Sequence, residues 1–231
     1  MNLTPQKLSH EEFLIEVRNL HIKARNAKFR KGKIVENVFR CTSHSISSEF
    51  EDLLAEYCSH FINTSKSSIF IDPQITFENK EFRNRSGKRG LLYRPDIIVV
   101  KNNEIVLLID AKVDIGFNRK NFGALINEKV KLVEKIAGQM VKFKLPDKKS
   151  FSGIKISQSI KLTCFVASGR SGITQPNLDE ITPAKRINIF HLSKGGHLNN
   201  YSDLKGDDNL VNVDLASMEA FDQYLLNTIG V

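Results

Sequence analysis

The stretch RPDIIVVKNNEIVLLIDAK, residues 94–112, decides how this chain folds. It holds two apolar runs, at 97–100 and 105–109, separated by a short polar segment with the sequence KNN. Apolar runs of this length, joined by a few polar residues, are typical of the two strands of a β-hairpin. We therefore expect one strand at 91–100 and a second at 104–112.

Charged residues stand at one end of this predicted hairpin. Asp96 opens the first strand, and Asp110 and Lys112 close the second. Because side chains alternate along a strand, Asp110 and Lys112 share a face and Ala111 points away. Pairing through the turn brings Asp96 beside Asp110, so two carboxylates and an ammonium converge on one edge of an apolar sheet. The alternative is an ordinary turn residue after a proline, followed by a solvated strand end.

Two such carboxylates have a chemical consequence. They repel each other at neutral pH unless a cation bridges them. Hard oxygen ligands with no His or Cys nearby favour Mg²⁺, or Mn²⁺ in its place, over zinc. A metal held this way polarises a phosphoryl oxygen and lowers the pKa of a bound water, and Lys112 would orient or help to deprotonate that water and offset charge on the phosphate. Asp96, Asp110 and Lys112 are thus predicted to hydrolyse a phosphodiester.

Hydrophobic periodicity predicts the elements around the hairpin. The expected helices are 9–29, 48–62, 123–144 and 214–229, and the further strands are 69–77, 160–168 and 186–193. Pro73 requires an edge position or a bulge in its strand, and Pro146 ends the third helix. This order predicts one α/β domain with a central mixed β-sheet flanked by helices.

The order helix, three strands, helix, strand, with RPD at 94–96 and DAK at 110–112, resembles the PD-(D/E)xK nuclease superfamily. That group includes most type II restriction endonucleases, Holliday-junction resolvases and several repair and transposition nucleases. The resemblance implies that Asp96 and Asp110 bind the metal, with Lys112 beside the water.

The resemblance covers about half the chain, roughly residues 46–168. It implies a restriction-endonuclease-like core within a single nuclease domain at 1–231. The N-terminal helix at 9–30 and the C-terminal extension at 169–231 are elaborations of that core.

Many such nucleases add a carboxylate from the preceding helix, here Glu51 or Glu49. Glu51 has Leu54 and Ala55 three and four residues further on, which places it at the margin of the packed face. Its alternative role is a capping box with Ser48, and that of Glu49 is a solvated acid in the first turn. We prefer Glu51 as the fourth catalytic residue.

Basic residues are unevenly distributed over a chain whose net charge is +8. Segment 23–33 holds six basic residues and no acidic one, and segment 80–89 holds five and one, whereas 202–231 is acidic. A polyanion therefore has two places to dock, unless these segments are solvated loops. The residues expected to contact DNA are Arg83, Arg85, Lys88, Arg89, Arg119 and Lys120.

Two further features are weaker candidates. Gln139, on the predicted third helix, is placed like the glutamine that some members of the superfamily carry near the metal, and is otherwise an ordinary helix residue. The region 169–208 is a candidate for base readout.

Other function classes lack their signals. The three cysteines form no CxxC pair, so neither a zinc site nor a disulfide framework is indicated. No apolar run approaches the roughly 18 residues of a membrane span, and the first residues lack a signal-peptide core. We therefore expect a cytoplasmic protein with no membrane partner.

The function that these features favour is a Mg²⁺-dependent type II restriction endonuclease acting on double-stranded DNA. Cutting both strands of a palindrome requires two active sites, hence a homodimer, and restriction–modification requires a cognate DNA methyltransferase. The alternatives are a junction resolvase, a transposon-end or nonspecific defence nuclease, and a non-catalytic DNA-binding protein on the same scaffold.

Overall fold

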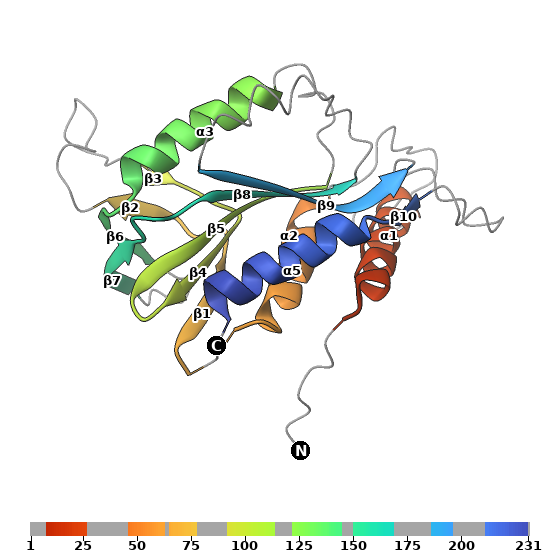
Figure 1. The fold of residues 1–231 in the computed structure, drawn as a ribbon, viewed down its shortest axis with the longest axis horizontal. Coiled ribbons are helices and arrows are strands. Elements are labelled where there is room, and N and C mark those ends of the chain that lie inside the picture. Colours follow the sequence, from red (N-terminus) through yellow and green to blue (C-terminus); the bar gives the residue numbers. More distant parts are fainter. Residues whose placement is uncertain are drawn as a thin grey trace, which may run out of the picture.

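A mixed β-sheet with helices on both faces forms the body of the protein (Figure 1), as the sequence predicts. The computed structural model describes residues 8–26, 46–62, 65–77, 92–113, 122–144, 150–168, 186–195 and 211–230. The helices are α1 (His10–Asn26), α2 (Ser47–Ser59), α3 (Phe122–Ile136) and α5 (Leu215–Ile229). The strands are β1 (Ser67–Ile71), β2 (Ile75–Phe77), β3 (Leu92–Tyr93), β4 (Ile97–Lys101), β5 (Glu104–Lys112), β6 (Met140–Lys144), β7 (Ser150–Ile156), β8 (Leu162–Ser168), β9 (Ile187–Gly195) and β10 (Val211–Val213).

The predicted hairpin is present as β4 and β5, which pair antiparallel. Its first strand is shorter than the predicted 91–100, because Leu92–Tyr93 forms the separate strand β3, which pairs with β2. Asn102 and Asn103 form its turn with φ values of 52° and 61°. Asparagine tolerates this left-handed conformation, and two such residues in succession match the right-handed twist of a hairpin. Ile97 pairs with Ile109, so the next step along the two strands sets Asp96 beside Asp110.

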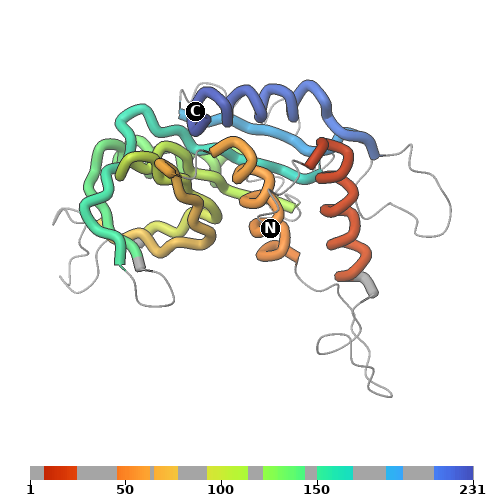
Figure 2. Tube along the Cα trace, turned by 90° about the horizontal axis from the view of Figure 1, so that it is seen from below, coloured from red at the N-terminus to blue at the C-terminus, as the bar shows by residue number. Residues whose placement is uncertain are grey.

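The sheet branches at β5. One edge of β5 carries β4, which in turn pairs with β1, and both pairings are antiparallel. The C-terminal half of the other edge pairs parallel with β8, which continues into β9 and β10. The start of that edge pairs parallel with β7, and from there the order runs β6, β2, β3. This second branch curls round on itself in Figure 2.

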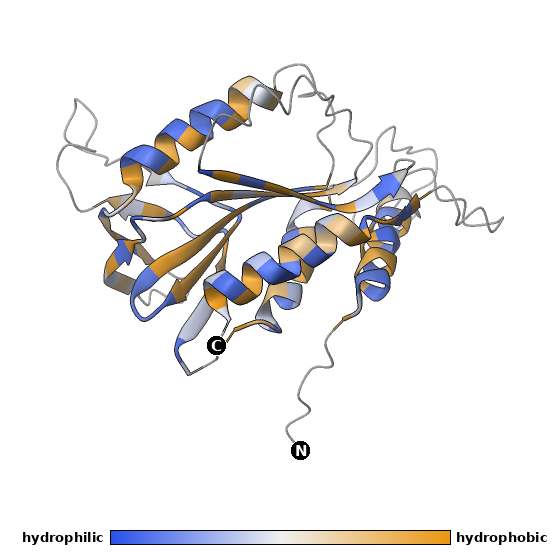
Figure 3. Cartoon of the chain, in the orientation of Figure 1, coloured by the Kyte–Doolittle hydropathy of each residue, from blue (hydrophilic) through white to orange (hydrophobic). Residues whose placement is uncertain are grey.

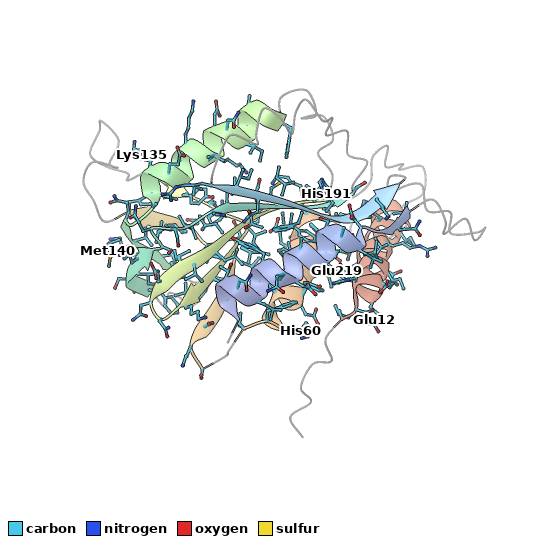
Figure 4. All side chains as sticks on the ribbon, viewed as in Figure 1. Glu12, His60, Lys135, Met140, His191 and Glu219 are labelled. Carbon is cyan, nitrogen blue, oxygen red and sulfur yellow. The ribbon has the colours of Figure 1, made fainter. Side chains whose placement is uncertain are left out.

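The helices cover the two faces unequally. The α1, α2 and α5 helices pack on one face, where Phe13, Phe165 and Phe221 belong to a single buried cluster. On the other face α3 buries Ile126 and Val133 against the sheet. Side chains fill both interlayer spaces (Figure 4), and the helices turn their polar sides outward (Figure 3). All seven residues of β8 are buried, as a continuous apolar run covered on both faces requires.

Along the chain, α2, β1, β4, β5, α3 and β8 give the order helix, three strands, helix, strand. The small strands β2 and β3 are inserted between β1 and β4, and β6 and β7 between α3 and β8. None of the described helices is both long and apolar enough to cross a membrane.

The predicted helix at 123–144 is wrong beyond residue 136. The α3 helix ends at Ile136, and Gly138 adopts a φ of 76°. Its N–H donates to the carbonyl of Ile156, which turns the chain into β6. Lys135 and Met140, labelled in Figure 4, mark the last turn of α3 and the first residue of β6.

The predicted strand at 69–77 is two strands rather than one. Asp72, with a φ of 49°, and the buried Pro73 separate β1 from β2, so the chain leaves one branch of the sheet and enters the other. Proline cannot donate a ladder hydrogen bond, and here it stands between strands instead of at an edge or bulge.

Candidate active site

The structure brings Asp96, Asp110 and Lys112 into contact at the end of the β4–β5 hairpin. The Lys112 ammonium lies 2.6 Å from Asp110 Oδ1 and 3.6 Å from Asp96 Oδ2. Asp96 Oδ2 also accepts a hydrogen bond of 2.7 Å from the backbone N–H of Ala111. This bond ties the carboxylate that opens β4 to the strand that carries the other two side chains.

Alternation along β5 explains which way these side chains point. Ala111 belongs to the cluster beneath α1, α2 and α5. Asp110 and Lys112 therefore face the other side, towards α3. The neighbour of Asp110 on β8 is Cys164, a fully buried thiol whose pKa burial raises to about 12. The expectation that no Cys lies near the carboxylates is therefore wrong, although this thiol stays protonated at neutral pH.

Lys129, from α3, is a site residue that the sequence analysis missed. Its ammonium lies 2.7 Å from Asp110 Oδ2, so each oxygen of this carboxylate has its own lysine. The signal was present in the helix periodicity: Lys129 stands three residues after Ile126 and four before Val133, on the stripe that faces the sheet. A lysine within an apolar stripe calls for a buried anion as its partner.

The charges shift the pKa values of the hairpin residues in different directions. Burial alone would raise the pKa of Asp110, but the ammonium groups of Lys112 and Lys129 outweigh it, and the pKa lies below its ordinary value. The pKa of Asp96 is raised, first by burial and then, against the effect of Lys112, by the neighbouring Asp110. Burial lowers the pKa of Lys112, but Asp110 and Asp96 together raise it above its usual range. Lys112 is therefore held as a charged ammonium between the two carboxylates.

The structure distinguishes the two candidate acids on α2. Glu51 is half-buried, and its pKa rises to about 7 through burial and then through the charges of Asp96 and Asp72. Glu49 is exposed and forms an ion pair of 2.7 Å with Lys23 on α1. Glu51 is thus the helix carboxylate whose charge acts on the hairpin acids.

The capping box proposed for Ser48 and Glu51 is wrong. The α2 helix begins one residue earlier, at Ser47, with Ile46 as its N-cap and no side-chain cap hydrogen bond. The carbonyl of Ile46 accepts the first helical bond, from Phe50, so Ser48 already lies inside the helix.

The turn that follows β1 brings Asp72 next to Asp96. The N–H of Asp72 donates to the carbonyl of Asp96 at 2.7 Å, and Arg94 donates to Asp72 Oδ2 at 2.8 Å. Tyr93 is buried nearby, and its pKa is raised by burial and then by Asp110 and Asp96. Sequence patterns gave no signal for Asp72 or Tyr93, because both reach the site through the pairing of β1 with β4 and of β2 with β3.

The donor set fits a hard divalent cation held by two carboxylates. Asp96 and Asp110 are adjacent, and the raised pKa of Asp96 reflects burial and like-charge repulsion that a cation would relieve. Among the residues that the structure describes, no three His, Cys, Asp or Glu side chains converge closely enough to form a metal-binding group by themselves. Asp96 and Asp110 are therefore the pair that could hold Mg²⁺, with water and substrate oxygens completing its coordination.

Gln139 does not lie at this site. It follows the end of α3, and its carbonyl accepts from Ile156, which pairs with Ile105 at the start of β5. Asp110 stands at the other end of the same strand. Arg186, in the region proposed for base readout, donates to the carbonyl of Gln158 at 2.9 Å ahead of β8.

The basic residues predicted to contact DNA fall outside the described parts of the chain. They are Arg83, Arg85, Lys88, Arg89, Arg119 and Lys120. Most of the basic segment 23–33 and of the region 169–208 falls outside as well. These contacts stay predictions.

Comparison of the sequence with protein-family models and with curated proteins, and of the fold with solved structures, gives no match.

Proposed function

We propose that this chain is a Mg²⁺-dependent endonuclease that hydrolyses phosphodiester bonds of double-stranded DNA. The observation that carries the proposal is the contact between Asp96, Asp110 and Lys112. It brings two carboxylates and an ammonium together at the open end of the β4–β5 hairpin. An ordinary surface ion pair needs one acid and one base. Here a third acid, Glu51, adds its charge to the group.

The arrangement of the elements supports the same proposal. The α2 helix precedes three strands paired antiparallel in the order β1, β4, β5, and α3 leads to β8, which pairs parallel with β5. This is the helix–strand–strand–strand–helix–strand order that motivates the comparison with PD-(D/E)xK nucleases. In support of it, Asp96 directly precedes β4, and Asp110 and Lys112 lie at the end of the adjacent strand β5.

Each residue has a part in the proposed reaction. Asp96 and Asp110 would hold Mg²⁺, which when bound polarises a phosphoryl oxygen and lowers the pKa of water. The Lys112 ammonium would offset the negative charge that builds on the phosphate as the bond to the leaving oxygen breaks. The Ala111 N–H fixes the Asp96 carboxylate. Glu51, with a pKa of about 7, can hold or release a proton beside the reacting groups at neutral pH.

Within this class we propose a type II restriction endonuclease that acts as a homodimer, with a cognate DNA methyltransferase as its partner in the cell. A junction resolvase, a transposon-end nuclease and a nonspecific defence nuclease would use the same four residues. The choice among them depends on the DNA substrate and on the number of chains in the active particle.

The test is incubation of the purified protein with a long sequenced duplex, with and without Mg²⁺, beside the Asp110→Asn variant. Discrete bands that require both Mg²⁺ and Asp110 would support a sequence-specific enzyme, and light scattering would then give the number of chains. A smear with the same requirements would assign a nonspecific nuclease. Intact duplex and intact branched DNA, together with DNA binding that is indifferent to Mg²⁺, would refute the proposal in favour of a binding protein.

A further inference from the structure

The two lysines on Asp110 are held very differently. Lys112 belongs to β5 itself, and besides Asp110 its ammonium lies 3.2 Å from the carbonyl of Ala111 and 3.6 Å from Asp96. Lys129 reaches across from α3 to the other oxygen of Asp110. The Asp110 side chain is 7% exposed and that of Lys129 is 39% exposed. Lys129 therefore enters from the solvent side, at the end of a long flexible side chain.

The cluster is close to charge balance as it stands. Asp96 and Asp110 carry two negative charges, and Lys112 and Lys129 carry two positive ones, so the charges of these four side chains cancel. A divalent cation that binds Asp110 must approach an oxygen that an ammonium already occupies. Two cations on one carboxylate repel strongly where water is largely excluded, so one of the lysines has to yield.

We propose that Lys129 is the residue that yields: it occupies part of the metal site, a divalent cation displaces it from Asp110 Oδ2, and its ammonium then binds a phosphate oxygen of the substrate. This inference rests on the proposed nuclease function for the identity of the phosphate, but the displacement concerns the protein and the cation alone. Lys112 stays in place because its strand and three oxygen contacts fix it.

The proposal has a thermodynamic consequence. A cation that frees Lys129 strengthens the binding of DNA, and by reciprocity DNA strengthens the binding of the cation by the same factor. In the absence of DNA, Lys129 keeps the affinity of the site for the cation low. The site would then become fully loaded when its substrate is present.

The experiment measures Mn²⁺ affinity of the DNA-free protein by calorimetry, because metal binding is observed there without any reaction. Lys129→Met removes the charge and keeps the apolar length of the side chain. Lys131→Met, at an exposed position on the same helix, is the matched control for a lost positive charge. We expect Lys129→Met to bind Mn²⁺ about tenfold more tightly than the parent, with Lys131→Met close to the parent.

A second variant tests whether a change in Mn²⁺ affinity comes from the lost charge or from altered folding. Lys129→Arg keeps the charge and should keep the Mn²⁺ affinity of the parent. With Ca²⁺ as a probe of DNA binding, the ion should strengthen binding less in Lys129→Met than in the parent. Unchanged or weaker Mn²⁺ binding by a folded Lys129→Met variant would overturn the inference.

The failure of this inference and that of the nuclease proposal can be told apart. If the parent cleaves DNA with Mg²⁺ while Lys129→Met binds Mn²⁺ as the parent does, displacement is wrong and the nuclease stands. If Mn²⁺ binding tightens in Lys129→Met but no DNA is cut, the displacement of Lys129 stands and the nuclease proposal falls.

Discussion

Two carboxylates in this molecule, the buried Asp110 and the half-buried Asp222, are both held at their two oxygens, but by different partners. Asp222, on α5, accepts a hydrogen bond of 2.5 Å from the Tyr57 hydroxyl at Oδ1 and lies 3.1 Å from His10 Nε2 at Oδ2. Asp110, at the end of β5, has an ammonium on each oxygen, from Lys112 and Lys129. The first group joins three helices, α1, α2 and α5, whereas the second stands at a strand end facing α3.

Under the proposed function, the difference separates an acid that serves stability from one that serves chemistry. Burial raises the pKa of Tyr57, and its bond to Asp222 raises it further, so the phenol remains a donor and the acid has partners that suit it. Around Asp110 there are further acids whose pKa values are raised, Asp96 and Glu51. Like charges gathered in this way lower stability and are typical of sites arranged for a ligand or a reaction.

The largest difference expected between Asp110 and Asp222 is in their effect on cleavage. Asp110→Asn should lower the rate about 10³-fold or more, because the variant loses a ligand of the proposed cation. Asp222→Asn should leave the cleavage rate per folded molecule unchanged. Initial rates on one plasmid, with DNA binding measured in Ca²⁺, give both values. Equal losses in the two variants would remove the distinction.

A smaller loss is expected from the donors on each carboxylate. Lys112→Ala should lower the cleavage rate about 10²-fold without weakening Mn²⁺ binding, since the ammonium acts on the charge that develops at the phosphate. Tyr57→Phe removes one donor from Asp222 and should not affect the rate. A Lys112→Ala enzyme with the rate of the parent would exclude Lys112 from the mechanism.

The contacts around Asp110 differ in how far the sequence predicts them. Alternation along β5 and the Asn102–Asn103 turn are local, so they place Asp96, Asp110 and Lys112 together before any packing is known. The Lys129 contact depends on how α3 lies across the sheet.

Contacts between segments far apart in the sequence also limit how well the helices and strands can be predicted. The run 123–144 keeps apolar residues at helical spacing past Ile136, and the turn at Gly138 is fixed only when β6 pairs with β7 and β2. Of this branch, β2 and β3 lie within the predicted strands at 69–77 and 91–100, whereas β6 was predicted as helix and β7 was not predicted. The strand β8, whose apolar run is continuous, was predicted from the sequence.

Stability should respond in the opposite sense to cleavage. Asp222→Ala leaves the Tyr57 hydroxyl and the His10 ring without this acceptor, and buried donors that lose a charged acceptor cost about 2 kcal/mol. We expect the free energy of unfolding to fall by that amount, with Tyr57→Phe losing about 1 kcal/mol. Urea unfolding followed by circular dichroism measures both. A stability equal to that of the parent would show that the α1–α2–α5 contact is held by its apolar residues alone.

The smallest effect is on the pH dependence of stability and comes from Glu51. Its pKa is about 7 in the folded protein against an ordinary value of 4.5, so between these values the folded state holds more protons and stability falls as the pH rises. Glu51→Gln removes this dependence. Between pH 5 and pH 8, without metal, the variant should gain on the order of 1 kcal/mol over the parent, since solvent screens much of the shift at this half-exposed side chain.

Glu49→Gln is the matched control for that measurement, because Glu49 lies on the same helix but is exposed and paired with Lys23. It should gain no stability over the parent between the two pH values. If Glu51→Gln behaves in the same way, then Glu51 does not feel the charges of Asp96 and Asp72, and α2 contributes no acid to the site. A gain confined to Glu51→Gln would instead show that Glu51 belongs to the group of carboxylates around Asp110. Added Mn²⁺ should then reduce the gain, because a cation held by Asp96 and Asp110 offsets the charge of Asp96, which adds to the effect of burial on the pKa of Glu51.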